Sequence, residues 1–353
     1  MDERLDLLRE LCNAFGPSGC EDNTAKIIID KISGICDDIK KDKLGNVIAL
    51  YKGTGISDKR IMISAHMDEV GFMVTHIDDD GYIHFCNVGG IDPRVICGRR
   101  VAYGDETKTI HGIVASKAIH QQSESERREA TPVDKMYVDI GAINKEEAEN
   151  HIKPGDFGTF VSDFVLYGNK MLRAKALDDR FGCGVIIEVL RRMHTTGYRP
   201  EFDLYCVFST REEIGKAGAI TAAFSVSPDI ALVIEATAVA DMADVSDNSV
   251  VAKTGDGIVI SLVDNGTIYD RELIDFAIKT GDKHNIKYQL KRYISGSNDA
   301  THIQKSKAGV RVCALSAPCR YIHSPSNVIN TDDYFSAIDM IYAMIKDITV
   351  QEI

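Results

Sequence analysis

Hydrophobic residues recur at helical spacing near the start of the chain and then give way to short continuous runs. Leu5, Leu8, Cys12 and Phe15 follow the i, i+3, i+4 pattern of an amphipathic helix, which ends before Gly16. Apolar runs rich in β-branched residues predict strands, and periodic runs predict further helices. We expect strands near 46–51, 60–66, 202–209, 230–235, 257–262 and 308–315, and helices near 21–35, 178–194, 216–224, 270–284 and 332–350.

The middle of the chain has a different pattern. Over residues 69–164 the segments are short and strand-like, and turn residues such as Asp79-Asp80-Gly81 and Gly89-Gly90 separate them. We therefore predict an α/β domain built from residues 1–68 and 165–353, interrupted by a small β-barrel or sandwich over 69–164. The polar run 121–129 is expected to be an exposed, mobile loop, and Thr331 is expected to cap the last helix.

Two adjacent carboxylates, Glu212 and Glu213, follow the strand predicted at 202–209. Ligands of open α/β sheets bind at the carboxyl ends of the strands. Successive residues of an extended segment point in opposite directions, so these two carboxylates need different partners. One could bind a metal ion while the other handles a proton. Taken alone, the pair also fits a solvated acidic turn.

Other residues of metal-binding type stand where strands or turns end. His66 closes a strand, Asp178 and Asp179 open a helix, Glu235 follows a buried strand and His323 follows the last one. Each has an ordinary alternative role, such as a helix cap for Asp178 or a hydrogen-bonded structural residue for the histidines. Together, however, two histidines and several carboxylates suit two adjacent divalent ions, namely zinc, cobalt or manganese.

Composition and charge narrow the class of protein. The 353 residues are 44% hydrophobic and 27% charged, as in ordinary globular proteins, and the net charge of −12 argues against nucleic acid as a main partner. No apolar run reaches membrane-spanning length, and no signal peptide is recognisable. The nine cysteines include no Cys-x-x-Cys pair. A reducing, cytoplasmic location is therefore expected.

Four segments, in this order, resemble the signatures of one family. They are Ala65-His66-Met67-Asp68-Glu69, Lys175-Ala176-Leu177-Asp178-Asp179-Arg180, Glu212-Glu213-Ile214-Gly215 and Arg320-Tyr321-Ile322-His323-Ser324-Pro325. The chain is similar, from about residue 5 to 345, to the glutamyl and deblocking aminopeptidases, a family of dinuclear metallopeptidases that includes TET aminopeptidases and cellulase M-like proteins. The resemblance implies a zinc-peptidase-like α/β/α catalytic domain with a mixed sheet and the inserted β-domain.

The resemblance also implies a role for each site residue. His66, Asp178 and Glu235 would hold one metal ion, and Asp178, Glu213 and His323 the other, so that Asp178 bridges. Glu212 would be the general base, taking a proton from the attacking water and giving it to the leaving amine. Asp68 would fix the tautomer of His66. Glu235 departs from the family, where Asp is more usual, and Asp299 is given a substrate-side role.

The family further implies peptide substrates and a homo-oligomer, from a dimer to a tetrahedral dodecamer. Residues 69–164 would then make subunit contacts, and the polar loop 120–129 would approach a neighbouring subunit. The sequence alone leaves three other readings open. They are a metal-dependent amidohydrolase acting on N-acylated small molecules, an endoglucanase, and a non-catalytic assembly protein. The preferred N-terminal residue, the physiological metal and the size of the assembly are left open too.

Overall fold

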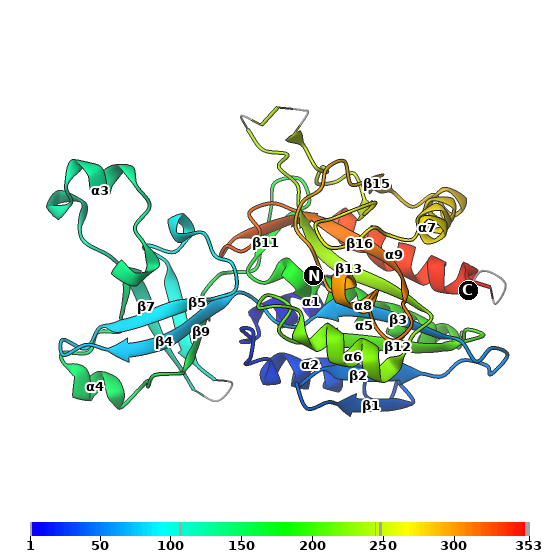
Figure 1. The fold of residues 1–353 in the computed structure, drawn as a ribbon, viewed down its shortest axis with the longest axis horizontal. Helices are drawn as coiled ribbons and strands as arrows, with labels where there is room; N and C mark the ends of the chain where they lie inside the picture. Colours follow the sequence, from blue (N-terminus) through cyan, green and yellow to red (C-terminus); the bar gives the residue numbers. More distant parts are fainter. Residues whose placement is uncertain (1, 106–107, 244, 247–248, 350–353) are drawn as a thin grey trace.

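The fold of a computed structural model, described for residues 2–105, 108–243, 245–246 and 249–349, is an α/β domain joined to a barrel (Figure 1). Within the described residues, eight strands form one mixed sheet, which confirms the predicted fold class. Their order across the sheet is β1 (Asp38–Lys41), β2 (Val47–Tyr51), β12 (Asp203–Ser209), β3 (Arg60–His66), β13 (Ile230–Ala238), β16 (Arg311–Cys319), β14 (Ile258–Ile260) and β15 (Tyr288–Leu290).

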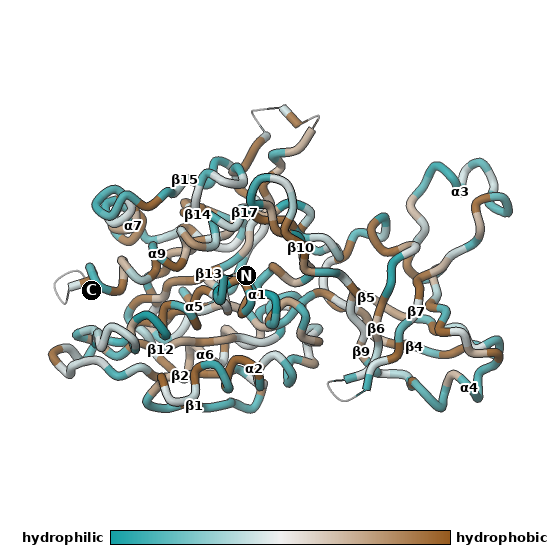
Figure 2. Tube along the Cα trace, turned by 180° about the vertical axis from the view of Figure 1, so that it is seen from behind, coloured by the Kyte–Doolittle hydropathy of each residue, from teal (hydrophilic) through white to brown (hydrophobic). Residues whose placement is uncertain are grey.

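The centre of this sheet is parallel. Strands β12, β3, β13 and β16 run in the same direction, whereas β2 and β14 pair antiparallel to them. Six of the seven residues of β3 are buried, since helices cover both faces of the sheet. The edge strand β1 is only half-buried, and Figure 2 shows hydrophilic residues along it. The parallel strands therefore bring their carboxyl ends to one edge.

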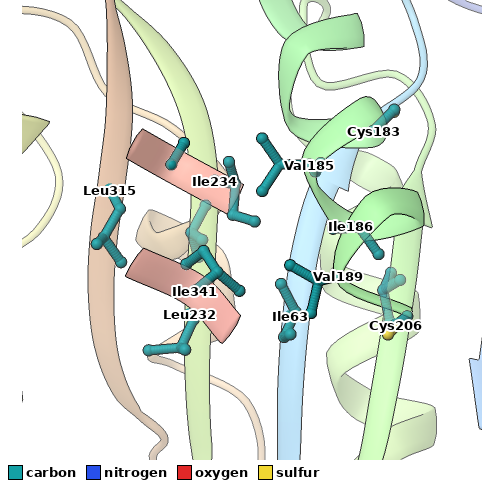
Figure 3. Close-up of a cluster of buried hydrophobic side chains, with 14 of the residues drawn as sticks. Ile63, Cys183, Val185, Ile186, Val189, Cys206, Leu232, Ile234, Leu315 and Ile341 are labelled. Carbon is teal, nitrogen blue, oxygen red and sulfur yellow. The ribbon is translucent and has the colours of Figure 1, made fainter. Parts of the chain in front are cut away.

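Helices lie in two layers over the sheet. One layer holds α1 (Glu3–Asn13), α2 (Asp22–Ile32), α5 (Leu177–Thr196), α7 (Arg271–His284) and α9 (Thr331–Asp347), and the other holds α6 (Ala217–Val226) and α8 (Ala300–Ile303). Figure 3 shows Val185 and Val189 of α5 beside Ile63 of β3, within the main hydrophobic core. In α5, a Cβ at Gly182 would lie 2.8 Å from that of Ala65, so close packing on the sheet requires glycine there.

The inserted segment is a closed barrel with its own core. Its strands are β4 (Gly71–Ile77), β5 (Ile83–Val88), β8 (Tyr137–Asp139), β7 (Thr109–Ala115), β6 (Arg100–Gly104) and β9 (Phe157–Phe160), in this order around the barrel. Phe72 fills its centre and makes edge-on contacts with Phe85 and Phe160, at ring-centroid distances of 5.1 and 5.0 Å. A small sheet of β10 (Val165–Tyr167), β11 (Met171–Ala174) and β17 (Asn327–Asn330) follows.

Several local predictions were wrong. The run 121–129, expected as a loop, contains the exposed helix α3 (Glu124–Arg128), because Ser123 and Glu126 form a capping box. A further short helix, α4 (Lys145–Glu149), lies in the barrel segment. The side chain of Asn330, and not that of Thr331, caps α9. That helix ends at Asp347, and its predicted end, residue 350, lies outside the described residues.

Two further sequence expectations concern cysteines and membranes. None of the nine cysteines forms a disulfide, and five of them are buried. Among the described residues, none of the helices combines the length and hydrophobicity needed to cross a bilayer.

A buried ionic cluster joins the barrel to the α/β domain. Glu69 lies between β3 and β4 and is 3% exposed. Its Oε1 is 2.5 Å from Lys175 Nζ and 3.6 Å from Arg180 Nη2, and its Oε2 accepts a hydrogen bond from Thr159 of β9 at 2.8 Å. Arg180 also donates to the carbonyl oxygen of Leu11 at 2.6 Å. One carboxylate thus ties the barrel to both α1 and α5.

We expect Glu69→Gln to destabilise the protein by about 3–5 kcal/mol, since Lys175 and Arg180 would remain buried as cations without a carboxylate. The measurement is urea unfolding followed by circular dichroism at fixed protein concentration. Glu124→Gln is the matched control, because Glu124 pairs with Arg128 on the surface of α3. That variant should unfold at the wild-type urea concentration. An unchanged midpoint for Glu69→Gln would contradict the assigned role of the cluster.

Candidate metal centre

The candidate site lies where the parallel strands end. His66 is the last residue of β3, and Ser209, the last residue of β12, pairs with it. Glu235 lies in β13, which continues to Ala238, so the prediction that Glu235 closes its strand was wrong. The longer strand keeps Glu235 paired with Ser316 of β16, and its side chain still reaches His66. The sheet therefore brings together residues separated by up to 169 positions.

The side chain of Asp178 lies between the two histidines. Its Oδ1 is 3.1 Å from His66 Nε2, and its Oδ2 is 3.2 Å from His323 Nε2. Glu235 Oε2 is 3.6 Å from the same nitrogen of His66, and Glu213 Oε2 is 3.2 Å from that of His323. His66 is thus close to Glu235, His323 is close to Glu213, and Asp178 is close to both histidines. The sequence analysis predicts two ions that share Asp178, and this assignment of ligands stays a prediction.

The unpaired oxygens of this cluster suit divalent cations. Glu213 Oε1 and Glu235 Oε1 are buried and have no hydrogen-bond partner among the described residues. Burial raises the pKa of Glu213 to about 7, although His323 favours its charged form. Buried carboxylates without donors are costly unless a cation or a proton compensates their charge. Imidazole nitrogens and carboxylate oxygens are donors that zinc, cobalt and manganese accept, so the residues fit the implied metals.

Asp179 was named in the sequence next to Asp178 but was not assigned as a ligand. The peptide between the two residues is cis, and both have non-helical backbone angles, so neither is part of the regular helix that follows. Asp179 Oδ1 accepts the amide of Gly182 at 2.9 Å, and Oδ2 is buried and has no hydrogen-bond partner in the described part of the chain. One ligand atom each of His66, Asp179 and Glu235 lie within 4.8 Å of one another. Asp179 is therefore a further candidate oxygen ligand beside His66.

Asp68 connects His66 to the turn that carries the two glutamates. It is completely buried, and its Oδ1 and Oδ2 accept the backbone amides of Glu212 and Glu213, both at 3.1 Å. Ser18 donates its hydroxyl to Oδ2, and His66 Nδ1 lies 3.4 Å from Oδ1. Burial alone would raise the pKa of Asp68, but the hydrogen bonds from His66, Ser18 and Glu212 outweigh it and keep the pKa low.

The two preceding amides of the same turn are held in the same way. Thr210 N–H donates to Asn46 Oδ1 at 2.9 Å, and Arg211 N–H donates to Glu21 Oε1 at 3.1 Å. Arg211 has a φ of +57°, a backbone conformation that needs such support. Side chains from three separate places in the first 68 residues thus hold four consecutive amides after β12. No local pattern of residues indicated these contacts.

Glu212 and Glu213 have different partners, as expected for neighbours on an extended segment. Glu212 Oε1 is 3.1 Å from Lys216 Nζ, whereas Glu213 faces His323. Burial raises the pKa of Glu212, while His66 and Lys216 favour its charged form. Asp299, given a substrate-side role from the sequence, is completely buried and accepts the hydroxyl of Ser209 at 2.6 Å. Asp299 thus holds the last residue of β12 through this hydrogen bond.

A cavity of about 370 Å³ opens onto these residues. The residues that line it include Asp178, Glu212, Glu213, Glu235 and His323. A larger groove of about 1100 Å³ lies elsewhere, between α1, α5 and α9, and is lined mainly by charged side chains. That groove contains none of the histidines or carboxylates of the candidate centre. The smaller cavity is therefore the candidate substrate site.

The barrel takes part in this centre. His323 Nδ1 donates to the carbonyl oxygen of Gly90 at 2.8 Å, which leaves Nε2 free as a ligand atom. The neighbouring Gly89 has a φ of +86°, and a Cβ there would lie 2.9 Å from Val70 Cγ1 and 3.3 Å from Glu213 Cβ. The segment after β5 therefore packs directly against two of the candidate ligands. The sequence analysis predicted only a turn at Gly89-Gly90.

Two histidines and a cluster of mostly buried carboxylates at the end of a mixed sheet, together with an inserted barrel, are the features of a metallopeptidase. The chain belongs to the M42 glutamyl aminopeptidase family, whose profile matches residues 45–340. It is therefore an aminopeptidase, a hydrolase of peptide bonds. The lysyl aminopeptidase of Pyrococcus furiosus is 30% identical over 347 residues, which are 97% of each chain.

Solved structures agree with this assignment. A TET aminopeptidase from Thaumarchaeota archaeon SCGC AB-539-E09 superposes with a TM-score of 0.95 at 33% identity, covering 99% of this chain and 98% of the other. The TET1 peptidase of Pyrococcus horikoshii, which can assemble into a tetrahedron or a large octahedral shell, has a TM-score of 0.87 at 31% identity and covers 98% and 100%. The family resemblance seen in the sequence is thus confirmed.

The contact between the barrel and His323 leads to a prediction about metal binding. Gly89→Ala should weaken binding at the Glu213–His323 side about tenfold or more, because the new methyl group displaces Glu213 and the Gly90 carbonyl. Calorimetric titration of chelator-stripped protein with zinc measures this. Gly141→Ala is the control, since Gly141 has a similar φ of +81° but no atom within 4 Å of the added Cβ. Equal affinities in the two variants would contradict the role of the Gly89-Gly90 segment.

Proposed function

We propose that this aminopeptidase releases the N-terminal residue of peptides with the help of two divalent cations, zinc or cobalt in the first place and manganese as an alternative. His66, Asp178 and Glu235 would hold one cation, and Asp178, Glu213 and His323 the other. The observation that carries this proposal is the position of Asp178, whose two oxygens lie 3.1 and 3.2 Å from the two histidines. When bound, two such cations polarise the scissile carbonyl and make a water molecule more acidic.

The protein's own side chains handle the proton and the geometry. Glu212 would accept the proton of the attacking water and deliver it to the leaving amine, since it lines the cavity beside the candidate ligands. Lys216, at 3.1 Å, orients its carboxylate. Asp68 keeps Nδ1 of His66 protonated and Nε2 free. The free α-amino group of the substrate is a cation, so a cavity walled by carboxylates favours exopeptidase cleavage at that end.

We also propose that the chain assembles with copies of itself through the barrel over residues 69–164. The ability of the P. horikoshii relative to form closed shells supports this. The exposed helix α3 stands away from the body of the barrel (Figure 1) and is placed to approach a neighbouring subunit. Light scattering after size-exclusion chromatography would give the mass, and a mass of one chain would contradict the proposal.

The role of Glu212 is tested by Glu212→Gln, which keeps the shape of the side chain but removes the base. We expect turnover to fall by about 10²–10⁴-fold while the metal content stays that of the wild type. Aminoacyl-p-nitroanilide hydrolysis and elemental analysis measure the two quantities. Glu146→Gln, on an exposed residue of α4, should change neither. Retained activity in Glu212→Gln would remove the base assignment.

Chelator treatment separates the remaining alternatives. We expect the stripped protein to lose all hydrolysis of free-amine substrates and to regain it with zinc, cobalt or manganese, because the carboxylate cluster needs cations to act. N-acetylated substrates should stay intact. Cleavage of only the acetylated substrates would favour the amidohydrolase. Chelator-resistant cleavage of β-glucan would favour the endoglucanase, and metal binding without any cleavage would favour a non-catalytic protein.

A further inference from the structure

The segment 210–218, which leads from β12 into the first turn of α6, carries three of the side chains that line the cavity. They are Glu212, Glu213 and Lys216. The backbone folds back on itself here, since the amide of Lys216 donates to the carbonyl oxygen of Arg211 at 2.9 Å. Arg211 and Lys216 have φ angles of +57° and +62°, a left-handed conformation that residues other than glycine rarely adopt. Such a conformation persists only where surrounding contacts hold it.

The side chain of Asn46 contacts both ends of this segment. Asn46 is completely buried and directly precedes β2, whose Val47 pairs with Phe208 of β12. Its Oδ1 accepts the amide of Thr210 at 2.9 Å, and its Nδ2 donates to the carbonyl oxygen of Gly218 at 3.0 Å. The amide of Gly218 also donates to the carbonyl oxygen of Thr210 at 3.1 Å. One side chain thus closes the segment into a loop.

The contact at Gly218 depends on the absence of a side chain. A Cβ there would lie 2.4 Å from Asn46 Oδ1 and 2.3 Å from the carbonyl oxygen of Thr210. Glycine permits this close approach of the backbone, which any larger residue would prevent. The distance between the two ends of the segment is therefore set by Asn46 and by the start of α6.

Asn46 is held in turn by Asp42. Asp42 Oδ2 accepts a hydrogen bond from Asn46 Nδ2 at 2.6 Å, and Oδ1 accepts the backbone amides of Leu44, Gly45 and Asn46 at 2.9, 3.0 and 3.0 Å. Asn46 Nδ2 also lies 2.9 Å from the hydroxyl oxygen of Thr221 in α6. Buried polar networks whose groups are satisfied make the structure around them rigid. Asn46 is thus a fixed point against which the segment can be held.

We propose that Asn46 is a positioning residue for peptide hydrolysis. By keeping the segment 210–218 closed, it holds Lys216 Nζ 3.1 Å from Glu212 Oε1 and directs the carboxylate of Glu212 to the cavity. Asn46 is not one of the described residues that line the cavity, so it acts through Glu212 and not on the substrate. The proposal rests on the proposed function, because it takes Glu212 to be the base.

The experiment measures kcat, KM and metal content of the metal-loaded, full-length enzyme with an aminoacyl-p-nitroanilide as substrate. Asn46→Asp keeps the acceptor for Thr210 and removes the donor to Gly218. Since a small displacement of a catalytic group is costly, kcat should fall about 10–100-fold while KM stays within about threefold of wild type. Asn46→Ser, which is too short to reach both ends, should have the same effect. Metal content should not change, because Asp68 accepts the amide of Glu213.

A second background distinguishes positioning from general damage. In Glu212→Gln the group that Asn46 positions is already lost, so adding Asn46→Asp should lower the residual rate less than about threefold. A loss of folded protein would lower the rate by the same factor in both backgrounds. Tyr51→Phe is the control, because it removes a buried hydrogen bond to the carbonyl oxygen of Tyr198 at the far end of β2. Its kcat should match that of wild type.

Each result decides between the two levels of the argument. An unchanged kcat in the Asn46 variants, an equal loss in the two backgrounds, or failure of both variants to fold would overturn this proposal. The aminopeptidase would stand, and Asn46 would only stabilise the fold. Full activity of Glu212→Gln would remove the base assignment and this proposal with it. No cleavage by metal-loaded wild type would overturn the proposed function as a whole.

Discussion

The carboxylate of Asp68 is the interaction on which the rest of the centre depends. It accepts the amides of both Glu212 and Glu213 and faces His66 from two residues along the chain. The ends of β3 and β12 are therefore joined by one buried group, so the positions of two proposed ligands, His66 and Glu213, and of the proposed base Glu212 are set together. A buried carboxylate is stable only when donors satisfy it, and this requirement explains why the turn after β12 has no freedom to relax.

The candidate centre lowers the stability of the fold. Carboxylate oxygens of Glu213 and Glu235 are buried without hydrogen-bond donors among the described residues, which lowers stability unless cations bind. Clusters of perturbed acids of this kind are typical of functional sites. The buried carboxylate of Glu69, by contrast, has partners for its charge: it pairs with Lys175 and Arg180 and accepts a hydrogen bond from Thr159. The satisfied carboxylate of Glu69 lies only three positions after the candidate ligand His66, so a structural charge cluster and the candidate centre are neighbours along the chain.

The barrel contributes to the geometry of the candidate centre. It enters the chain directly after β3, is held at Glu69, and returns the Gly90 carbonyl to His323. The orientation of one proposed ligand thus depends on a domain that the α/β sheet does not contain. A change in the orientation of the barrel, for example on contact with another copy of the chain, would alter the orientation of His323 through this hydrogen bond. Gly90 also lines the cavity beside the candidate ligands, so residues of the barrel segment and of the α/β domain both bound that space.

Local pattern was enough for much of this protein. The alternation of apolar runs and helical periods determined the α/β class, the inserted β-segment and the positions of His66, Asp178, Glu213 and His323 relative to their elements, because each depends on residues close in the chain. Only the tertiary structure decided that Ser209 pairs with His66, that Asp178 lies between two histidines 257 positions apart, and that Asp179 is close enough to His66 and Glu235 to be a candidate ligand. These relations follow from the strand order β12-β3-β13-β16 and from buried hydrogen bonds between distant segments, which periodicity does not encode.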